Sequence, residues 1–318
     1  MDKNTTVYRQ RRGKANESGK AMQAGRRLTA FAALCIITVY FAMIGSSVAL
    51  RLEWIMKVQI VPVALSVSGS LILIWGLLTL LFGRIYCSMV CPAGITQDIA
   101  ARLPRASSRL RRRHPYRYHQ PHNRFRYAWL AVTVVTAVAG LSISLSLFDP
   151  DTAFSRIMTC LVRPLIDAGA GRRVAAGSAA GIVTALLTLA VIVIVPLRRG
   201  RLLCNTVCPV GAALSLVSRN SVYRMDINTD LCVNCGRCER VCKAECIDYK
   251  EHSVDMSRCV VCFNCTAECE NGAITYTRRR HHLSIPMLMK QPPQRAATMS
   301  AGPAARQSIT SESTKSPQ

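Results

Sequence analysis

Eight cysteines near the carboxyl end repeat one spacing twice. Each run reads C-x2-C-x2-C-x3-C, the first at Cys232, Cys235, Cys238 and Cys242 and the second at Cys259, Cys262, Cys265 and Cys269. Thiolates at this spacing are typical of iron–sulfur cubes that take three ligands from one run and the fourth from the other. The sequence therefore predicts one [4Fe–4S] cluster on Cys232, Cys235, Cys238 and Cys269, and a second on Cys259, Cys262, Cys265 and Cys242.

Zinc and disulfide bonds are the alternatives for these eight thiols. Zinc favours paired cysteine knuckles set well apart rather than three thiolates packed closely. In a reducing compartment the same spacing indicates metal ligation rather than disulfides. Clusters are the favoured interpretation, and they predict electron transfer. Cys246 falls opposite Ala273 when the two runs are aligned, so we expect it to be a small buried core residue.

Four stretches without a charged residue precede the cysteine runs, at residues 28–50, 58–83, 127–148 and 174–197. Each holds 22 to 26 residues, and a helix needs about 20 to cross a bilayer core. The first stretch is longer than the core of a cleaved signal peptide, so we expect an uncleaved anchor. The sequence predicts an all-α membrane protein with four transmembrane helices, plus a small α+β domain that binds the two clusters.

Positive charge is spread unevenly along a chain whose formal net charge is +24. Residues 1–27 hold eight Lys and Arg, 84–126 hold ten and the segment from Arg198 onward holds seventeen, against two in 51–57 and four in 149–173. The positive-inside rule then predicts a multi-pass protein of the bacterial inner membrane, with both termini and the cluster domain cytoplasmic. The loop 149–173 is expected to form an amphipathic helix on the outer surface. Nucleic-acid binding is disfavoured because no binding motif accompanies the charge.

A second repeat lies in the membrane half. The element Gly-Arg-x2-Cys-x3-Cys-Pro-x-Gly occurs at residues 83–94 and again at 200–211, each time after two spans, which predicts a parallel duplicated two-helix unit. We expect Pro92 and Pro209 to open short helices, and the helix dipole to lower the pKa of the preceding thiol. The four cysteines, Cys87, Cys91, Cys204 and Cys208, are a hypothetical shared redox or metal site. The alternative is a tight turn with small sulfur side chains packed inside.

Together, the four spans, the two Gly-Arg-x2-Cys-x3-Cys-Pro elements and the terminal cysteine runs resemble the NapH/NosR-like family of membrane 4Fe-4S proteins, over residues 28–278. The resemblance is closer to the short NapH-like form, and no outer flavin domain is expected. It implies that electrons pass between the quinone pool, or a cytoplasmic donor, and a partner oxidoreductase. The chain would then be a redox subunit of a quinol dehydrogenase-type system rather than a stand-alone enzyme.

The remaining expectations concern domains and cofactors. We expect a basic tail at 1–27, with about its first 20 residues unstructured, a membrane domain at 28–222, a ferredoxin-like domain at 223–280 and a disordered tail at 281–318. No histidine lies in a span, so we expect no haem b, while bound quinone remains a candidate. An assembly or maturation factor for a partner metalloenzyme is the alternative function, because it would need the same clusters on a membrane platform.

Overall fold

Helices make up most of the structure, with two short antiparallel sheets near the carboxyl end. The computed structural model describes residues 3–44, 51, 69–103, 116–139, 149–169, 171 and 178–278. Side chains are described from Asn16 in the first helix and from Leu73 in the second. Residues 1–279 form one compact unit, so the expected membrane and cluster regions pack together. The expected disordered tail, 281–318, lies outside the described residues.

Two described helices are long and apolar enough to cross a membrane. They are α1 (Lys3–Ala42), through its part Asn16–Ala42, and α13 (Ala179–Arg199). They coincide with the first and fourth expected spans. The other two expected spans are described only in part, as α4 (Gly69–Phe82) and α9 (Asn123–Val138). The described residues therefore contain two candidate spans, and four are not shown.

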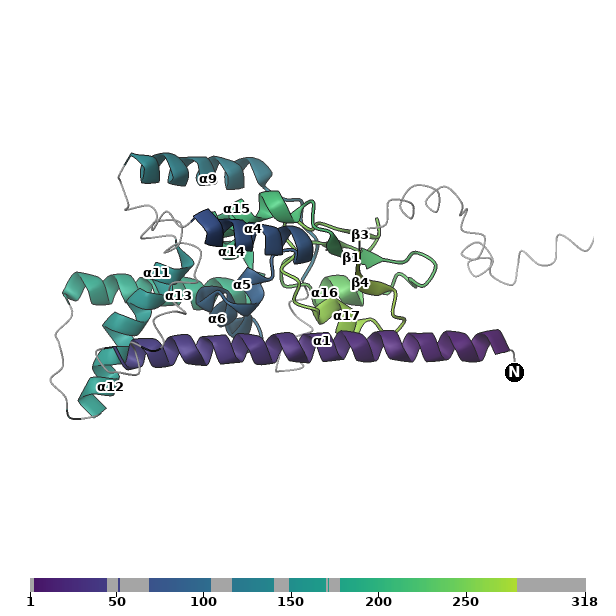
Figure 1. Ribbon diagram of the computed structural model, residues 1–318, viewed down its shortest axis with the longest axis horizontal. Helices are drawn as coiled ribbons and strands as arrows, with labels where there is room; N and C mark the ends of the chain where they lie inside the picture. Colours follow the sequence, from purple (N-terminus) through teal and green to yellow (C-terminus); the bar gives the residue numbers. More distant parts are fainter. Residues whose placement is uncertain are drawn as a thin grey trace, which may run out of the picture. The chain divides into compact units, whose positions relative to one another are not determined.

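Two pairs of short helices follow α4 and α13 and carry the repeated cysteine element (Figure 1). The first pair is α5 (Tyr86–Met89) and α6 (Pro92–Ala100), and the second is α14 (Leu202–Thr206) and α15 (Pro209–Ser218). In both pairs the proline occupies the first turn of the longer helix, where its missing N–H costs nothing. The expected short helices after the prolines are confirmed.

The helix expected within residues 149–173 is present, but it packs against segments that were expected on the other side of the membrane. The segment forms α11 (Pro150–Ile157), the π-helical turn η1 (Met158–Val162) and α12 (Arg163–Gly169). Its start packs against α6 and α13, and its end reaches α1, where Arg163 donates a hydrogen bond to the Ile44 carbonyl at 3.2 Å. Groups on opposite sides of a bilayer core about 30 Å thick cannot touch. The expectation that residues 149–173 and the loop carrying α6 face opposite sides is therefore wrong where α11 meets α6.

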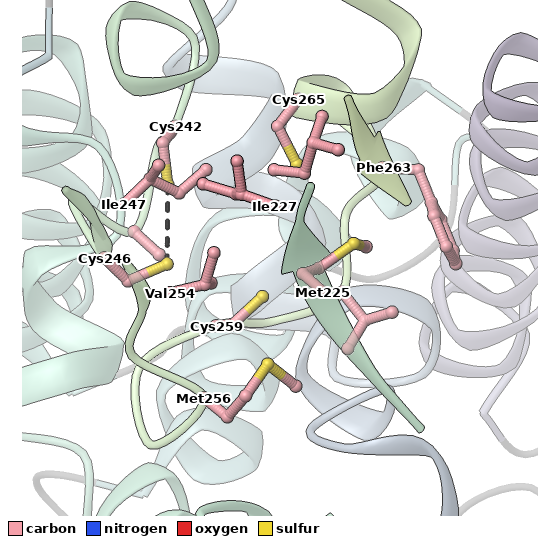
Figure 2. Packing of buried hydrophobic residues seen from close by; sticks show 13 residues of the cluster. Met225, Ile227, Cys242, Cys246, Ile247, Val254, Met256, Cys259, Phe263 and Cys265 are labelled. Carbon is pink, nitrogen blue, oxygen red and sulfur yellow. Dashed lines mark hydrogen bonds between the residues drawn. The ribbon is translucent and has the colours of Figure 1, made fainter. Parts of the chain in front are cut away.

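The segment that carries the two cysteine runs, residues 223–278, is called the cluster region below. It has the expected α+β organisation. Strand β1 (Tyr223–Ile227) pairs antiparallel with β4 (Ile274–Arg278), and β2 (Ile247–Asp248) pairs antiparallel with β3 (Ser253–Val254). Helices α16 (Arg237–Arg240) and α17 (Asn264–Glu268) each lie inside one cysteine run. Apolar residues of the strands pack around the cysteines in one buried cluster (Figure 2). Each half of the region thus places a cysteine run between short strands.

Helix α1 also packs against the cluster region, which the sequence did not indicate. Gln23 donates a hydrogen bond to the Asn264 side chain at 2.8 Å, and a Cβ at Gly19 would lie 2.9 Å from the Thr266 carbonyl carbon. The helix begins at Lys3, so the expectation of an unstructured start is wrong. The tail is helical because it continues the first span and gains these contacts with α17.

Candidate functional site

The structure brings the first predicted set of thiols together. The pKa of Cys238 is raised to about 12, mainly by burial and in smaller part by the neighbouring thiols of Cys232, Cys269 and Cys235. Cys269 belongs to the second run, so the fourth member of this set comes from the other half of the region. Cys235 is exposed, whereas Cys232, Cys238 and Cys269 are partly buried. This set therefore reaches the protein surface.

The second predicted set is also together, and it is more deeply buried. Burial raises the pKa of Cys265 well above its usual range, and the thiols of Cys262, Cys242 and Cys259 add to this effect. Cys242 comes from the first run, which completes the exchange between the two halves. Cys238 of the first set also acts on Cys265, so the two sets are neighbours. Electrons could pass between centres held at these two positions.

The loops between the cysteines adopt the same unusual backbone in both runs. Asn234 and Gly236 have φ of 54° and 65°, and Val261 and Phe263, at the matching positions, have φ of 51° and 58°. Left-handed backbone is costly for a β-branched residue such as valine. Such strain persists where the surrounding structure fixes the conformation, and it gathers at functional sites. The loops therefore fit a role in wrapping a bound group.

Among the described residues, no three His, Cys, Asp or Glu side chains lie close enough to share a single metal ion. A cube of iron and sulfide occupies the space between its thiolates, so its ligands stand farther apart than the ligands of one ion.

Cys246 is buried as expected, but it also contacts a predicted ligand. Its Sγ lies 3.5 Å from that of Cys242, and the hydrogen bond between the two lowers the pKa of Cys242 to about 7 (Figure 2). Cys259 also shares a hydrogen bond with Cys246. A thiol here helps Cys242 to become a thiolate.

The repeated element in the membrane half builds two matching turns. Cys91 and Cys208 are helix N-caps, whose sulfurs accept hydrogen bonds from the N–H groups of Gly94 at 3.4 Å and Gly211 at 3.3 Å. The glycines are needed because a Cβ would lie 2.3 Å from the Cys87 carbonyl oxygen in the first copy and 2.1 Å from that of Cys204 in the second. In each copy, the spacing of Cys, Cys, Pro and Gly is thus explained by one compact turn that positions the two cysteines of that copy.

The arginines of the repeat are exchanged between the two copies. Arg201, of the second copy, donates to the Cys87 carbonyl at 2.6 Å and to the Gly94 carbonyl at 3.1 Å, both in the first copy. Arg84, of the first copy, donates to the Cys204 carbonyl at 3.2 Å in the second. Both arginines are fully buried. Each turn is therefore held by the arginine of the other turn.

The four cysteines of the repeat lie together, but the pKa values of Cys91 and Cys208 run against expectation. Burial raises the pKa of Cys91 well above its usual range, and Cys87, Cys204 and Cys208 raise it further, while the Gly94 N–H lowers it less. Burial likewise raises the pKa of Cys208. The predicted lowering by the helix N-terminus is wrong because loss of water around the thiol outweighs the dipole. Without a bound cation, Cys91 and Cys208 would be neutral, unreactive thiols.

These cysteines also adjoin the second ferredoxin set. Cys87 and Cys91 belong to a buried cluster with Trp75, Tyr86 and Val260, and Cys208 and Cys262 pack against it. Cys262 is one of the predicted cluster ligands. The described residues therefore arrange three sets of thiols in series, from the repeat through the buried set to the partly exposed set.

A buried acid that sequence reasoning missed ties these regions together. Asp98, on α6, forms ion pairs with Arg201 at 2.7 Å, Arg26 at 2.9 Å and Lys243 at 3.2 Å. Burial alone would raise the pKa of Asp98, but the cations, Arg201 foremost, hold it well below its usual range. Its only sequence signal is an acid on a short helix otherwise free of charge. Asp98 joins α1, both repeat copies and the cluster region.

Family comparisons agree with the cysteine patterns. A family model described as a 4Fe-4S binding domain matches residues 65–113 and 182–228, and another with the same description matches residues 225–248. The first two segments contain the repeated element, and the third contains the first cysteine run. The chain thus carries 4Fe-4S ferredoxin-type domains. No solved structure matches the chain.

Three relatives show how far the similarity extends. An uncharacterized protein of Methanocaldococcus jannaschii is 25% identical over 203 residues, 63% of this chain and 67% of that protein. The methylamine utilization ferredoxin-type protein MauN of Paracoccus denitrificans is 31% identical over 182 residues, 57% of this chain and 56% of its own length. Pyruvate synthase subunit PorD of Methanothermobacter marburgensis is 37% identical over 58 residues, 18% of this chain and 70% of that subunit. The chain therefore belongs to the ferredoxin-type iron–sulfur electron-transfer proteins.

Proposed function

We propose that the chain relays electrons through two [4Fe–4S] clusters held by the crossed cysteine sets. One cluster is assigned to Cys232, Cys235, Cys238 and Cys269, and the other to Cys259, Cys262, Cys265 and Cys242. One observation supports the proposal most directly. Cys269, from the second run, lies near Cys238 of the first, and Cys242, from the first run, lies near Cys265 of the second. Such clusters supply one-electron transfer without making or breaking bonds to the protein. The fold supplies their burial and spacing.

The partly exposed set is proposed as the contact with a redox partner. Cys235 is exposed, and the neighbouring Val233 has 66% of its surface accessible. Arg237, beside this set, is paired with Glu270 at the surface. A partner oxidoreductase docking here would come close to the first cluster, while the second stays shielded from water. The order of the sets then defines a path from the interior to the surface.

A membrane platform is the second part of the proposal. Leu28 and Phe31 on α1, and Val183 and Leu187 on α13, are more than half exposed although they are large and apolar. Exposed apolar surface on long helices is explained by contact with lipid. The excess of Lys and Arg in residues 1–27 and from Arg198 onward favours a cytoplasmic position for the cluster region in a bacterial inner membrane.

An apolar cavity marks a position for a lipid-soluble electron donor. It has a volume of about 320 Å³ and lies between α6, α11, α13 and α14, and Gln97, Arg156, Leu187, Cys204 and Cys208 are among its lining residues. Apolar walls with a few polar groups are typical of small-molecule sites. A quinol bound there would adjoin the thiols of the repeat and release two electrons and two protons on oxidation. This cavity supports the quinone pool as donor.

Anaerobic purification followed by reduction tests the proposal. We expect broad absorption near roughly 400 nm that dithionite bleaches, with about four iron atoms for each cluster. Addition of a short-chain quinol should produce the electron paramagnetic resonance signals of reduced clusters. A colourless protein with less than about one iron per chain would overturn the relay. Reduction by dithionite but not by quinol would leave the clusters and remove the quinone donor.

A further inference from the structure

We propose that Cys87, Cys91, Cys204 and Cys208 hold a third [4Fe–4S] cluster, with the buried guanidinium groups of Arg84 and Arg126 as its counter-charges. The inference extends the proposed relay and rests on it. It concerns a centre built from two distant segments rather than from one cysteine run.

The number of ligands requires the two copies to act together. A [4Fe–4S] cube takes four thiolates. Each of the two longer matched segments, 65–113 and 182–228, contains only two cysteines. Neither segment can therefore hold a cube alone. The structure places all four thiols within electrostatic range of one another, since Cys87, Cys204 and Cys208 all act on Cys91.

Contacts within the protein hold the backbone around these thiols in place. Each arginine of the repeat holds the turn of the other copy, and each turn leaves no room for a Cβ at its glycine. Sites that bind a group tightly need ligands held in place by supporting contacts. The exchanged arginines supply that support from both sides. A simple helix-to-helix turn would not need the two copies to interlock.

Buried positive charge exceeds buried negative charge around the thiols of both copies. Asp98 pairs with Arg201, Arg26 and Lys243, so one carboxylate faces three cations there, and the position that matches Asp98 in the second copy is the buried Ser215. Arg84 and Arg126 both donate to the Ser257 carbonyl, at 3.1 and 3.2 Å.

Nearby acids do not balance these two guanidiniums. Nε of Arg84 and both Nε and Nη1 of Arg126 are buried without a hydrogen-bond acceptor among the described residues. Asp255 acts on Arg126, but its carboxylate is already bonded to Ser257 and Arg258. Burying such charges without a counter-ion is strongly unfavourable.

A cluster would supply the missing negative charge. A cube in its oxidised form with four thiolates carries a net charge of about −2, because a 2+ core meets four negative sulfurs. Arg84 already lies with Nη2 3.8 Å from the Cys87 sulfur. Burial and Arg84 lower the pKa of Arg126 to about 10, and Cys87 acts in the opposite direction. Two buried cations that both act on Cys87 therefore fit an anionic centre better than a core of uncharged thiols.

The position of the centre completes the relay. Cys208 and Cys262 pack against one buried cluster of residues, so the third centre would adjoin the second ferredoxin cluster. On its other side, Cys204 and Cys208 line the apolar cavity. An electron leaving a donor in the cavity would reach the third centre first, and each centre would gain one electron and pass one on.

Iron content tests the assignment directly. We expect about twelve iron atoms per chain in the wild type. The double variant Cys91→Ser, Cys208→Ser should lose about one third of the iron and one paramagnetic signal while both ferredoxin signals stay. The control Cys35→Ser, Cys160→Ser, which changes two cysteines outside all three sets, should keep all of the iron. Full iron retention in the first variant would overturn the proposal and leave the two-cluster relay intact.

A second variant covers the case in which the first does not fold. Replacing all eight ferredoxin cysteines with serine leaves the repeat unchanged. The variant protein should retain about four iron atoms. Absence of iron from a folded variant, shown by its helical circular dichroism, would also overturn the third centre. Absence of iron from the wild type would instead remove the relay itself.

The arginines are tested through the redox potential. Arg126→Gln removes positive charge, so adding an electron becomes harder and the potential of the third centre should fall, while the two ferredoxin potentials stay. Arg126→Lys should restore most of the shift. Arg124→Gln, at an exposed position on the same helix, is the matched control and should change nothing. Equal potentials in all four proteins would show that Arg126 is not a counter-charge.

Discussion

The cluster region and the repeat of the membrane half use cysteine in two different ways. In the cluster region, three of every four thiols come from one short loop with left-handed backbone, and one set is partly exposed. In the repeat, each turn provides two thiols, Cys87, Cys91 and Cys204 are almost fully buried, and the arginines are exchanged between copies. The first arrangement can be read from the spacing of cysteines within one segment. The second depends on packing between segments more than 100 residues apart.

Single cysteine replacements should separate the two ferredoxin sets most clearly. Cys269→Ser should remove the cluster of the partly exposed set, and Cys242→Ser that of the buried set, although each residue lies in the other run. Each change should cost about four iron atoms and one paramagnetic signal. The measurement is iron content with electron paramagnetic resonance. If Cys242→Ser instead removed the signal that also depends on Cys235, ligation would be uncrossed.

Loss of Asp98 should have the largest effect on stability, because it links the two regions. Asp98→Asn leaves three buried cations without their acid, and breaking a buried ion pair in this way costs about 3–5 kcal/mol. The free energy of unfolding, measured by denaturant titration in detergent, should fall by that amount. Glu270→Gln breaks the exposed pair with Arg237 and serves as the control, with no measurable change expected. Similar losses in both variants would mean that Asp98 has no special role.

The glycines of the repeat should show a smaller effect confined to that half. In Gly211→Ala the new Cβ would lie 2.1 Å from the Cys204 carbonyl oxygen, so the turn must shift. Overpacking of this kind costs about 1–3 kcal/mol. We expect unfolding at lower denaturant, with both ferredoxin signals unchanged in the native state. Gly25→Ala, on α1 with nothing within 4 Å, is the control. Loss of the ferredoxin signals in Gly211→Ala would mean that the two regions do not hold their thiols independently.

The sequence predicted those features that depend on neighbours along the chain. The grouping of three thiols from each run, the buried Cys246 and the helices that begin at Pro92 and Pro209 follow from spacing and helix capping. The helical tail and the position of α11 depend on contacts with α17 and α6, which are distant in sequence. The pKa of Cys91 was predicted with the wrong sign because local charge is visible in a sequence and burial is not. Asp98 was missed for the same reason, since one acid acquires a role only when three cations from three segments surround it.

Filling the apolar cavity should give the smallest effect, and this effect should be limited to electron entry from quinol. Leu187→Trp and Ala153→Phe enlarge side chains that line the cavity without changing a thiol. The rate of cluster reduction by quinol should fall severalfold because the donor must approach Cys204 and Cys208 through this space, while reduction by dithionite should keep its rate. Leu186→Trp is the matched control, because Leu186 is an exposed residue of α13 that does not line the cavity. Equal slowing by Leu186→Trp and Leu187→Trp would assign the effect to the lipid-facing surface of α13 and leave the cavity without a role.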